Sequence, residues 1–149
     1  MDFQTPESIC NLMASLLPEN AGNILEPTPG IGNLSRALNG KGNVISPEDD
    51  FFKMKHKRKY NYIVMNPPFT PMKLGYQILY DCMELSNNII ALMPWLTIIN
   101  SQKRTSKIKE FGLVSIIHLP RSVFKGSRVQ TCILKMKKGY CNNTEFFCV

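Results

Sequence analysis

The sequence predicts an α/β domain whose sheet is mostly parallel. Short apolar runs of strand type alternate with segments that repeat apolar residues at helical spacing, which is the pattern that βα units produce. The last two strand-like runs, 113–119 and 132–138, have no helical segment between them, so we expect them to form an antiparallel hairpin at an edge of the sheet. A chain of 149 residues suits one domain with one core, which we expect to span residues 1–149.

The individual elements follow from local patterns. Thr5 and Pro6 predict a helix start, because threonine can cap a helix and proline fits its first position. Apolar residues then recur at helical spacing up to Leu17, and Pro18 ends the pattern. The remaining expected elements are strands at 23–26, 43–46, 62–65 and 88–93 and helices at 33–38, 74–85 and 101–111, the last with Ser101 as its cap and Gly112 at its end. The residues after 138 look irregular.

Composition limits the function. No apolar run is long enough to cross a membrane, and the first residues lack the features of a signal peptide, so we expect a cytoplasmic protein. The five cysteines form no Cys-x-x-Cys pair and there are two histidines, which argues against a disulfide framework and against a metal site. A net charge of +7 favours a polyanionic partner.

The candidate catalytic centre is Asn66-Pro67-Pro68-Phe69, which follows the apolar run 62–65. The prolines have fixed φ angles and no backbone N–H, so the strand ends in a stiff corner. The Asn66 side-chain oxygen and the Pro67 carbonyl can accept hydrogen bonds from one amino group, while Phe69 can stack on a planar ring. This set suits a base held by its exocyclic amino group. An ordinary Pro-Pro turn after a strand is the alternative.

A second candidate region is the loop 26–32, which lies between a short strand and a helix. Gly30 and Gly32 let the backbone approach a bound nucleotide, and Glu26 stands at the end of the strand. A plain turn that needs glycine for a positive φ is the alternative. The next strand is followed by three acidic residues that can bind ribose hydroxyls or an adenine amino group, Glu48, Asp49 and Asp50.

Several segments fit one family when they are taken in order. They are Phe3-Gln4-Thr5-Pro6, Glu26-Pro27-Thr28-Pro29-Gly30-Ile31-Gly32, Asp50-Phe51-Phe52 and Asn66-Pro67-Pro68-Phe69. This order resembles the adenine-N6 DNA methyltransferases that use S-adenosylmethionine, in their gamma-type arrangement, and it is similar to small phage or mobile-element members. The resemblance extends to 119–121 and 130–134, so it covers nearly the whole chain. It implies a Rossmann-like methyltransferase domain. This chain departs from the family's pattern in two ways: it is shortened between the second strand and the catalytic strand, and it leaves no segment for a separate target-recognition domain.

The resemblance also implies roles for individual residues. The catalytic set is Asn66, Pro67, Pro68 and Phe69, without a metal. The cofactor, S-adenosylmethionine, would be bound by Phe3, Gln4, Thr5, Glu26, Pro27, Thr28, Gly30, Gly32, Glu48, Asp50 and Phe51. By position, Glu48 is the candidate for the ribose and Asp50 for the cofactor's adenine. The family usually has a helix and another strand between these acids, and here they are nearly adjacent.

The expected partner is adenine-containing DNA, duplex or single-stranded. The loop between the last two strands carries Arg121, Lys125 and Arg128, which with Lys73 are candidates for contacts to phosphates. A basic, solvent-exposed hairpin loop is the alternative. Because no segment remains for target recognition, a separate specificity subunit or a homo-oligomer is a further expected partner, as in restriction-modification.

Two rival functions stay open. The same corner can present a glutamine amide, as in the release-factor methyltransferases, although these usually carry tyrosine at position 69 and lack the Thr-Pro segment. The chain could also be a catalytically weak, DNA-binding partner subunit of a methyltransferase complex.

Overall fold

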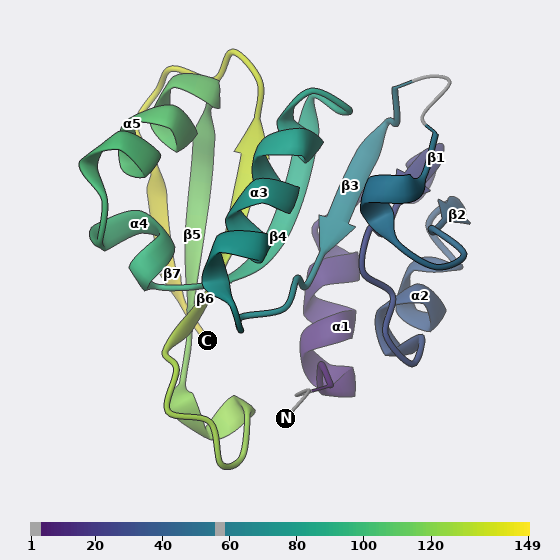
Figure 1. The fold of residues 1–149 in the computed structure, drawn as a ribbon, viewed down its shortest axis with the longest axis horizontal. Helices are drawn as coiled ribbons and strands as arrows, with labels where there is room; N and C mark the ends of the chain where they lie inside the picture. The colour runs from purple at the N-terminus through teal and green to yellow at the C-terminus, as the bar shows by residue number, and fades with distance from the viewer. Residues whose placement is uncertain (1–3, 56–58) are drawn as a thin grey trace.

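The computed structural model describes residues 4–55 and 59–149, which form a seven-stranded sheet flanked by helices (Figure 1). The strand order is β2-β1-β3-β4-β6-β5-β7. The strands are β1 (Asn23–Leu25), β2 (Asn43–Ile45), β3 (Tyr62–Met65), β4 (Asn88–Pro94), β5 (Leu113–Leu119), β6 (Thr131–Lys137) and β7 (Glu145–Cys148). The helices are α1 (Glu7–Ser15), α2 (Asn33–Leu38), α3 (Met72–Met83), α4 (Leu96–Ile99) and α5 (Gln102–Phe111), with short 3-10 helices η1 (Phe51–Lys53) and η2 (Arg121–Val123).

The strand pairing confirms the predicted mixed sheet. Strands β2, β1, β3 and β4 are mutually parallel, and β6 runs antiparallel to both β4 and β5. The hairpin is therefore present, but the prediction that it forms the edge of the sheet is wrong. Strand β6 lies between β4 and β5, and β7 pairs parallel to β5 and forms the edge. The expectation of an irregular end is likewise wrong, since 145–148 is a strand whose four residues are all exposed. An exposed strand carries no buried alternation, which is the signal that sequence patterns reveal.

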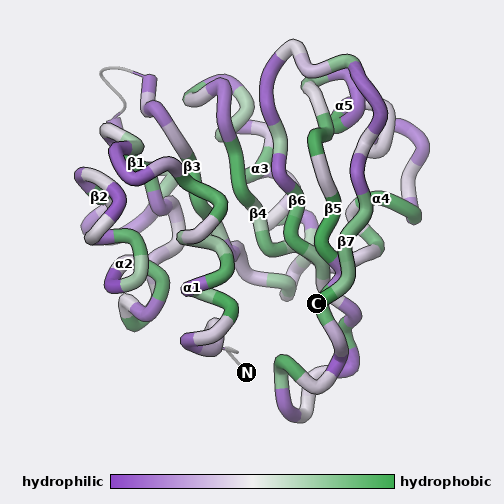
Figure 2. Tube along the Cα trace, turned by 180° about the vertical axis from the view of Figure 1, so that it is seen from behind, coloured by the Kyte–Doolittle hydropathy of each residue, from purple (hydrophilic) through white to green (hydrophobic). Residues whose placement is uncertain are grey.

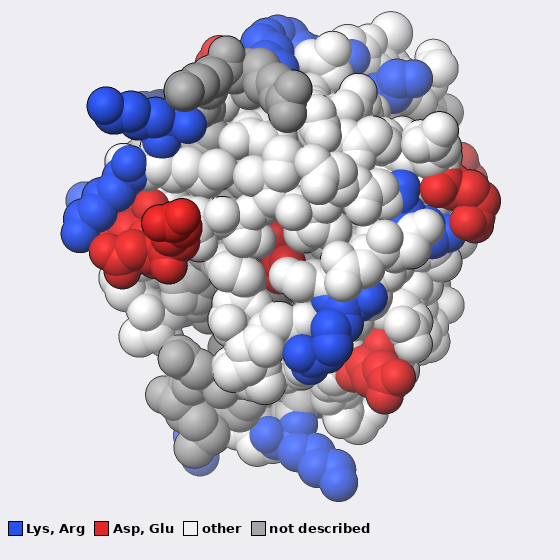
Figure 3. All heavy atoms as spheres, turned by 90° about the vertical axis from the view of Figure 1, so that its right-hand side faces the viewer, with Lys and Arg blue, Asp and Glu red and all other residues white. Residues whose placement is uncertain are grey.

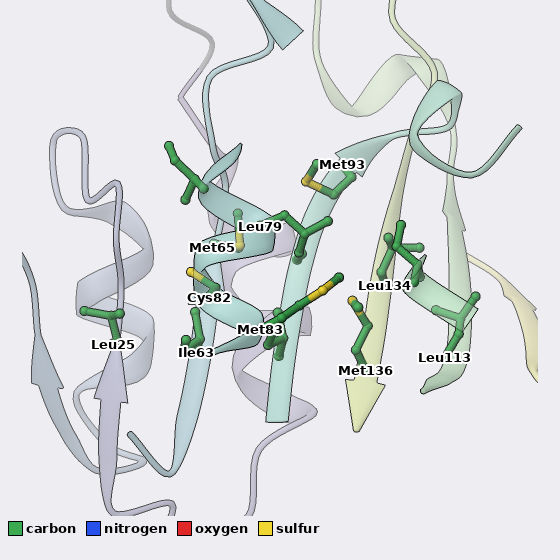
Figure 4. Packing of buried hydrophobic residues seen from close by; sticks show 14 of the residues in the cluster. Leu25, Ile63, Met65, Leu79, Cys82, Met83, Met93, Leu113, Leu134 and Met136 are labelled. Atoms are coloured by element: carbon green, nitrogen blue, oxygen red, sulfur yellow. The ribbon is translucent and has the colours of Figure 1, made fainter. Parts of the chain in front are cut away.

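Apolar side chains cover both faces of the sheet. In β3, Ile63 and Met65 belong to the cluster beneath α3 and α5, whereas Val64 belongs to the cluster beneath α1 and α2. Figure 4 shows the first cluster, where Leu79, Cys82 and other side chains of α3 meet those of the strands. Figure 2 shows that hydrophobic residues recur along the central strands β4, β6 and β5. The central strands are buried on both faces, as is typical of parallel sheets covered by helices.

The connection between β2 and β3 is short, as predicted. Its described residues contain η1 and no strand, so β2 forms one edge of the sheet. The carboxyl ends of β1, β3 and β4 all reach one edge, because these strands are parallel. The loops that follow β1 and β3 therefore meet there, and the connection from β5 to β6 projects from the same edge (Figure 1). None of the helices in the described ranges is long and apolar enough to cross a membrane.

Candidate active site

A cleft of 920 Å³ opens at the carboxyl edge of the sheet and collects most of the predicted site residues. Its walls come from five segments that are far apart in the sequence: the segment before α1, the loops after β1 and β2, the corner after β3 and the connection between β5 and β6. The predicted residues that line it are Gln4, Thr5, Glu26, Pro27, Thr28, Gly30, Glu48, Asp50, Phe51, Asn66, Pro67, Pro68 and Phe69. Phe3 lies outside the described residues. Gly32 and Lys73 lie outside the lining of the cleft.

The corner after β3 is built as its sequence predicts. Pro67 is buried, while Asn66 and Phe69 are partly exposed to the cleft. The Asn66 backbone carbonyl accepts a hydrogen bond from the Thr28 hydroxyl at 3.1 Å, which fastens the corner to the glycine loop. The carbonyls of Pro67 and Pro68 accept no hydrogen bond from the described part of the chain. Acceptors therefore stand beside an aromatic ring in one small volume.

The Asn66 side chain is held by a residue to which the sequence suggests a different task. Its Nδ2 donates to the hydroxyl of Thr5, which is 61 positions earlier. Thr5 was expected to cap α1, and this expectation is wrong: Pro6 occupies the cap position without any side-chain cap. Pro6 therefore occupies the cap position, and not the first helical position that was predicted for it. The Thr5 hydroxyl, which local sequence patterns predict at the helix cap, instead accepts a hydrogen bond from Asn66, a residue distant in sequence.

Glu26 is a buried carboxyl group at the inner wall of the cleft, with 1% of its surface exposed. Burial raises its pKa from 4.5 to about 7, and a hydrogen bond from the Ser35 hydroxyl opposes this rise. The cause is desolvation, because an ionised carboxylate loses water that one hydroxyl cannot replace. Glu26 therefore changes charge near neutral pH.

The glycine loop has the backbone that close approach to a ligand requires. Gly30 and Gly32 have φ values of +56° and +94°, a region that L side chains rarely adopt. A Cβ on Gly30 would lie 3.1 Å from Oε1 of Gln4, within the cleft. Gly32 precedes α2 and accepts the first hydrogen bond of that helix, from Arg36 N. The loop up to Gly30 and the first two residues of α2, Asn33 and Leu34, line the same cleft.

The acidic segment after β2 also lies at the cleft. Asp50 caps η1 by accepting a hydrogen bond from Phe52 N at 3.0 Å. Asp49 forms an exposed ion pair with Lys53 at 3.5 Å. Phe51 is buried, whereas the Phe52 ring, in edge contact with it, is 46% exposed. The exposed ring of this pair is the one that sequence analysis left out of the site.

Two further features of the site escaped the sequence analysis. Gly75 is buried in α3, and a Cβ there would lie 2.9 Å from the carbonyl oxygen of Pro68, so this glycine lets the helix pack against the corner. A glycine inside a helical pattern is the signal that could have found it. The cleft is also lined by Phe124, Ser127 and Val129 from the connection between β5 and β6. Phe124 is buried in the core and anchors that connection.

The predicted cations are outside the lining of the cleft, and Lys73, Lys125 and Arg128 are next in sequence to residues that line it. Lys73, Arg121, Lys125 and Arg128 are all exposed. With the Gln130 amide turned by a half-turn, which pairs its oxygen with donors, this oxygen accepts from Nε and Nη2 of Arg121 at 3.1 and 3.2 Å. On the face seen in Figure 3, acidic and basic side chains form small separate groups toward the rim, and acidic atoms are also visible near the middle. This face therefore carries no continuous basic surface.

Two of the buried cysteines are unsuited to nucleophilic chemistry. Burial raises the pKa of the Cys10 thiol to about 11, with a contribution from nearby Glu26, and that of Cys132 to about 12. Such thiols stay protonated and are poor nucleophiles. No group of three or more metal-binding side chains occurs within residues 4–55 and 59–149.

Comparison with known proteins identifies the fold of this chain. No protein-family model and no curated protein sequence matches this chain. A modification subunit assigned to a type I restriction enzyme of Vibrio vulnificus superposes with a TM-score of 0.74 at 16% identity, over 99% of this chain and 47% of that one. A protein of Listeria monocytogenes assigned to the class I S-adenosylmethionine-dependent methyltransferases gives 0.76 at 16% identity, over 98% and 65%. The 23S rRNA methyltransferase ErmE gives 0.68 at 14% identity, over 95% and 72%.

The chain thus has the Rossmann-like fold of the S-adenosylmethionine-dependent methyltransferases. It spans about half the length of the restriction-enzyme modification subunit that it matches.

Proposed function

We propose that this chain transfers a methyl group from S-adenosylmethionine to the N6 amino group of adenine in nucleic acid, with DNA as the expected substrate. The observation that carries the proposal is one cleft with two contrasting sides. The corner at Asn66 offers hydrogen-bond acceptors and a ring, and the loop at Gly30 offers a close backbone approach. Methyltransferases of this fold need both sides in one place.

The residues present fit the cofactor. A side chain on Gly30 would fill part of the cleft, and the buried carboxyl group of Glu26 stands at its inner wall. When bound, S-adenosylmethionine supplies an electrophilic methyl group. Gln4, Glu26 and the loop 27–30 would hold its methionine part, and an anionic Glu26 would favour a cationic ligand. The acidic segment 48–50 and the exposed Phe52 ring would hold the nucleoside part.

On the substrate side, the corner acts on the exocyclic amino group. The Asn66 side-chain oxygen and the Pro67 carbonyl would each accept a hydrogen bond from one of its N–H groups, which keeps the nitrogen lone pair out of conjugation with the ring. Phe69 stacks on the base and fixes its plane. The base must leave the duplex stack to reach this position. Positioning supplies most of the acceleration.

The phosphates of the nucleic acid would lie along the connection between β5 and β6. Phe124, Ser127 and Val129 of this connection line the cleft, so the exposed Lys125 and Arg128 beside them are close to the corner. Arg121 is less available, because it is bound to Gln130. Another pair of exposed cations, Lys55 and Lys59, leads into the amino end of β3 at the opposite edge of the sheet (Figure 1). We call this pair the far-edge lysines and regard them as the less favourable path.

We also propose that sequence specificity comes from outside this domain, from a further subunit or a second copy. The proposal rests on the length comparison, since the modification subunit that matches residues 1–149 is about twice as long. The cleft itself is lined by residues of the methyltransferase core.

The test is methyl transfer from labelled cofactor to duplex DNA, single-stranded DNA, RNA and a glutamine-containing peptide, followed by nucleoside and amino-acid analysis. We expect N6-methyladenine, and we expect Asn66→Ala to lower the rate about 10²-fold or more because a hydrogen bond that strengthens in the transition state is lost. Cofactor affinity should change little, as Asn66 faces the base. The matched control is Asn39→Ala, at an exposed asparagine after α2. Methylglutamine as the sole product, or full activity in Asn66→Ala, would exclude the proposed function.

A further inference from the structure

The hydrogen bond between Asn66 and Thr5 joins two distant parts of the chain at the centre of the cleft. Asn66 Nδ2 donates to Thr5 Oγ1, and Thr5 is buried, with 5% of its surface exposed. The Thr5 end of the bond is withdrawn from water, while Asn66 is partly exposed to the cleft. Losing such a bond leaves a buried polar group without a partner.

Both residues are fixed on their other sides. The Thr5 carbonyl accepts hydrogen bonds from Asn33 Nδ2 at 3.2 Å and from the Cys10 thiol at 3.6 Å. The Asn66 carbonyl accepts from the Thr28 hydroxyl at 3.1 Å. The backbones of Thr5 and Asn66 are therefore held by α1, α2 and the glycine loop. The hydrogen bond between the Asn66 amide and the Thr5 hydroxyl restricts the motion that remains, which is the rotation of that amide.

That rotation decides what Asn66 can do. An asparagine amide presents an acceptor on one side and a donor on the other, and a half-turn exchanges them. With Nδ2 on the Thr5 lone pair, Oδ1 is left to accept from a ligand, and no residue of the described chain donates to it. After a half-turn, Nδ2 would point its protons at the protons of a substrate amino group.

We propose that Thr5 is a positioning residue, whose hydroxyl holds the Asn66 amide in the orientation that accepts from the substrate amino group. The inference rests on the proposed function. It gives Thr5 a task different from helix capping, which it does not perform. The Thr5 hydroxyl accepts from Asn66 and keeps its own proton for another acceptor.

The first test needs no activity. In nitrogen-15 NMR spectra of the 17.0 kDa protein, the Asn66 side-chain amide pair is identified as the one missing in Asn66→Ala. We expect its protons to exchange with water at least about tenfold more slowly than those of the exposed Asn39, as a buried hydrogen bond requires. This measurement on the unaltered protein stands even if a variant fails to fold. Equal exchange of the two pairs would overturn the proposal.

The second test compares three variants. Thr5→Val removes the hydroxyl at similar volume, Thr5→Ser keeps it, and Thr97→Val is the matched control, because Thr97 is fully buried and its hydroxyl has no partner in the described chain. We expect Thr5→Val to shift the Asn66 amide pair and speed its exchange, Thr5→Ser to restore both, and Thr97→Val to change neither. An unmoved Asn66 pair in Thr5→Val contradicts the proposal.

Kinetic measurements then distinguish a role of Thr5 in positioning Asn66 from a purely structural role of Thr5. We expect Thr5→Val to lower kcat about tenfold, the equivalent of one neutral hydrogen bond, with the KM for the cofactor within about twofold of its original value. Thr5→Ser should recover most of kcat. If the amide is released and kcat is unchanged, or if only the cofactor KM rises, Thr5 does not position Asn66 for catalysis. If the unaltered protein methylates no substrate, the proposed function fails, while the exchange data still decide whether Thr5 holds the amide.

Discussion

Ionisation of Glu26 should make the stability of this protein depend on pH in an unusual direction. The carboxyl group is buried and accepts a hydrogen bond from Ser35, and burial raises its pKa from 4.5 to about 7. The folded protein therefore binds this proton more tightly than the unfolded chain does. Stability from this group is fully present below pH 4.5, falls as the pH rises toward 7, and stays low above that value.

The size of the effect follows from the pKa difference. Each pKa unit corresponds to about 1.4 kcal/mol, so a rise from 4.5 to about 7 corresponds to about 3 kcal/mol of unfolding free energy. Glu26→Gln cannot ionise, and its amide can still accept from Ser35. Between pH 4.5 and pH 8, the unaltered protein should therefore lose about 3 kcal/mol relative to this variant.

The assay is urea unfolding of both proteins at pH steps from 4.5 to 8.5, with the unfolding free energy extrapolated to water. Glu110→Gln, at an exposed glutamate in α5, controls for the loss of one carboxylate. The difference between the unaltered protein and Glu26→Gln should grow with pH, whereas Glu110→Gln should follow the unaltered protein. Parallel curves for all three would refute the reasoning, because they would mean that Glu26 titrates alike in the folded and unfolded states.

Three further changes test other parts of the protein. Gly75→Ala should lower the kcat of methyl transfer at least about tenfold, because the added Cβ meets the carbonyl oxygen of Pro68. Thermal stability should change little, since a gain of about 1 kcal/mol in helix propensity offsets this contact. Gly40→Ala, with open space around the added Cβ, is the control, and equal kcat values for Gly75→Ala and Gly40→Ala would contradict the packing role. Replacing Lys125 and Arg128 together by Ala should lower the salt slope of DNA binding by roughly one to two units in fluorescence anisotropy at several salt concentrations, and the double variant of the far-edge lysines should not. An unaltered slope would place the DNA elsewhere. Thr97→Val should leave the urea midpoint unchanged or raise it, because a buried hydroxyl without a partner is removed; a loss above about 1 kcal/mol would reveal a partner for that hydroxyl.

Much of the fold could be predicted because the signals are local. The spans 33–38 and 113–119 agree with the predicted ones, and Ser101 caps α5 through a hydrogen bond from Arg104 N. The two pieces with the clearest local chemistry, the Pro-Pro corner and the glycine loop, also have the expected form. Proline fixes φ and glycine permits a positive φ, so these choices depend on the residue itself more than on its neighbours in space.

Residues whose roles depend on a distant partner could not be predicted in the same way. Thr5 has two options, a cap for α1 and a bond to Asn66, and the choice between them depends on where β3 ends relative to α1. From the sequence, Gly75 only lowers the helix propensity of its segment. Its packing role becomes visible when the structure places the Pro68 carbonyl against it. The order β4-β6-β5 and the pairing of β7 likewise depend on which strand edges meet.

The sequence by itself determined the α/β class, the buried strands and the identity of two of the loops that line the cleft, the glycine loop and the Pro-Pro corner, because hydrophobic period, proline and glycine act over a few residues. Only the tertiary structure decided how those loops face each other, which hydroxyl holds Asn66, and how far burial raises the pKa of Glu26. The physical reason is that hydrogen-bond partners and desolvation are properties of the space around a side chain, and that space is filled by segments far away in the sequence.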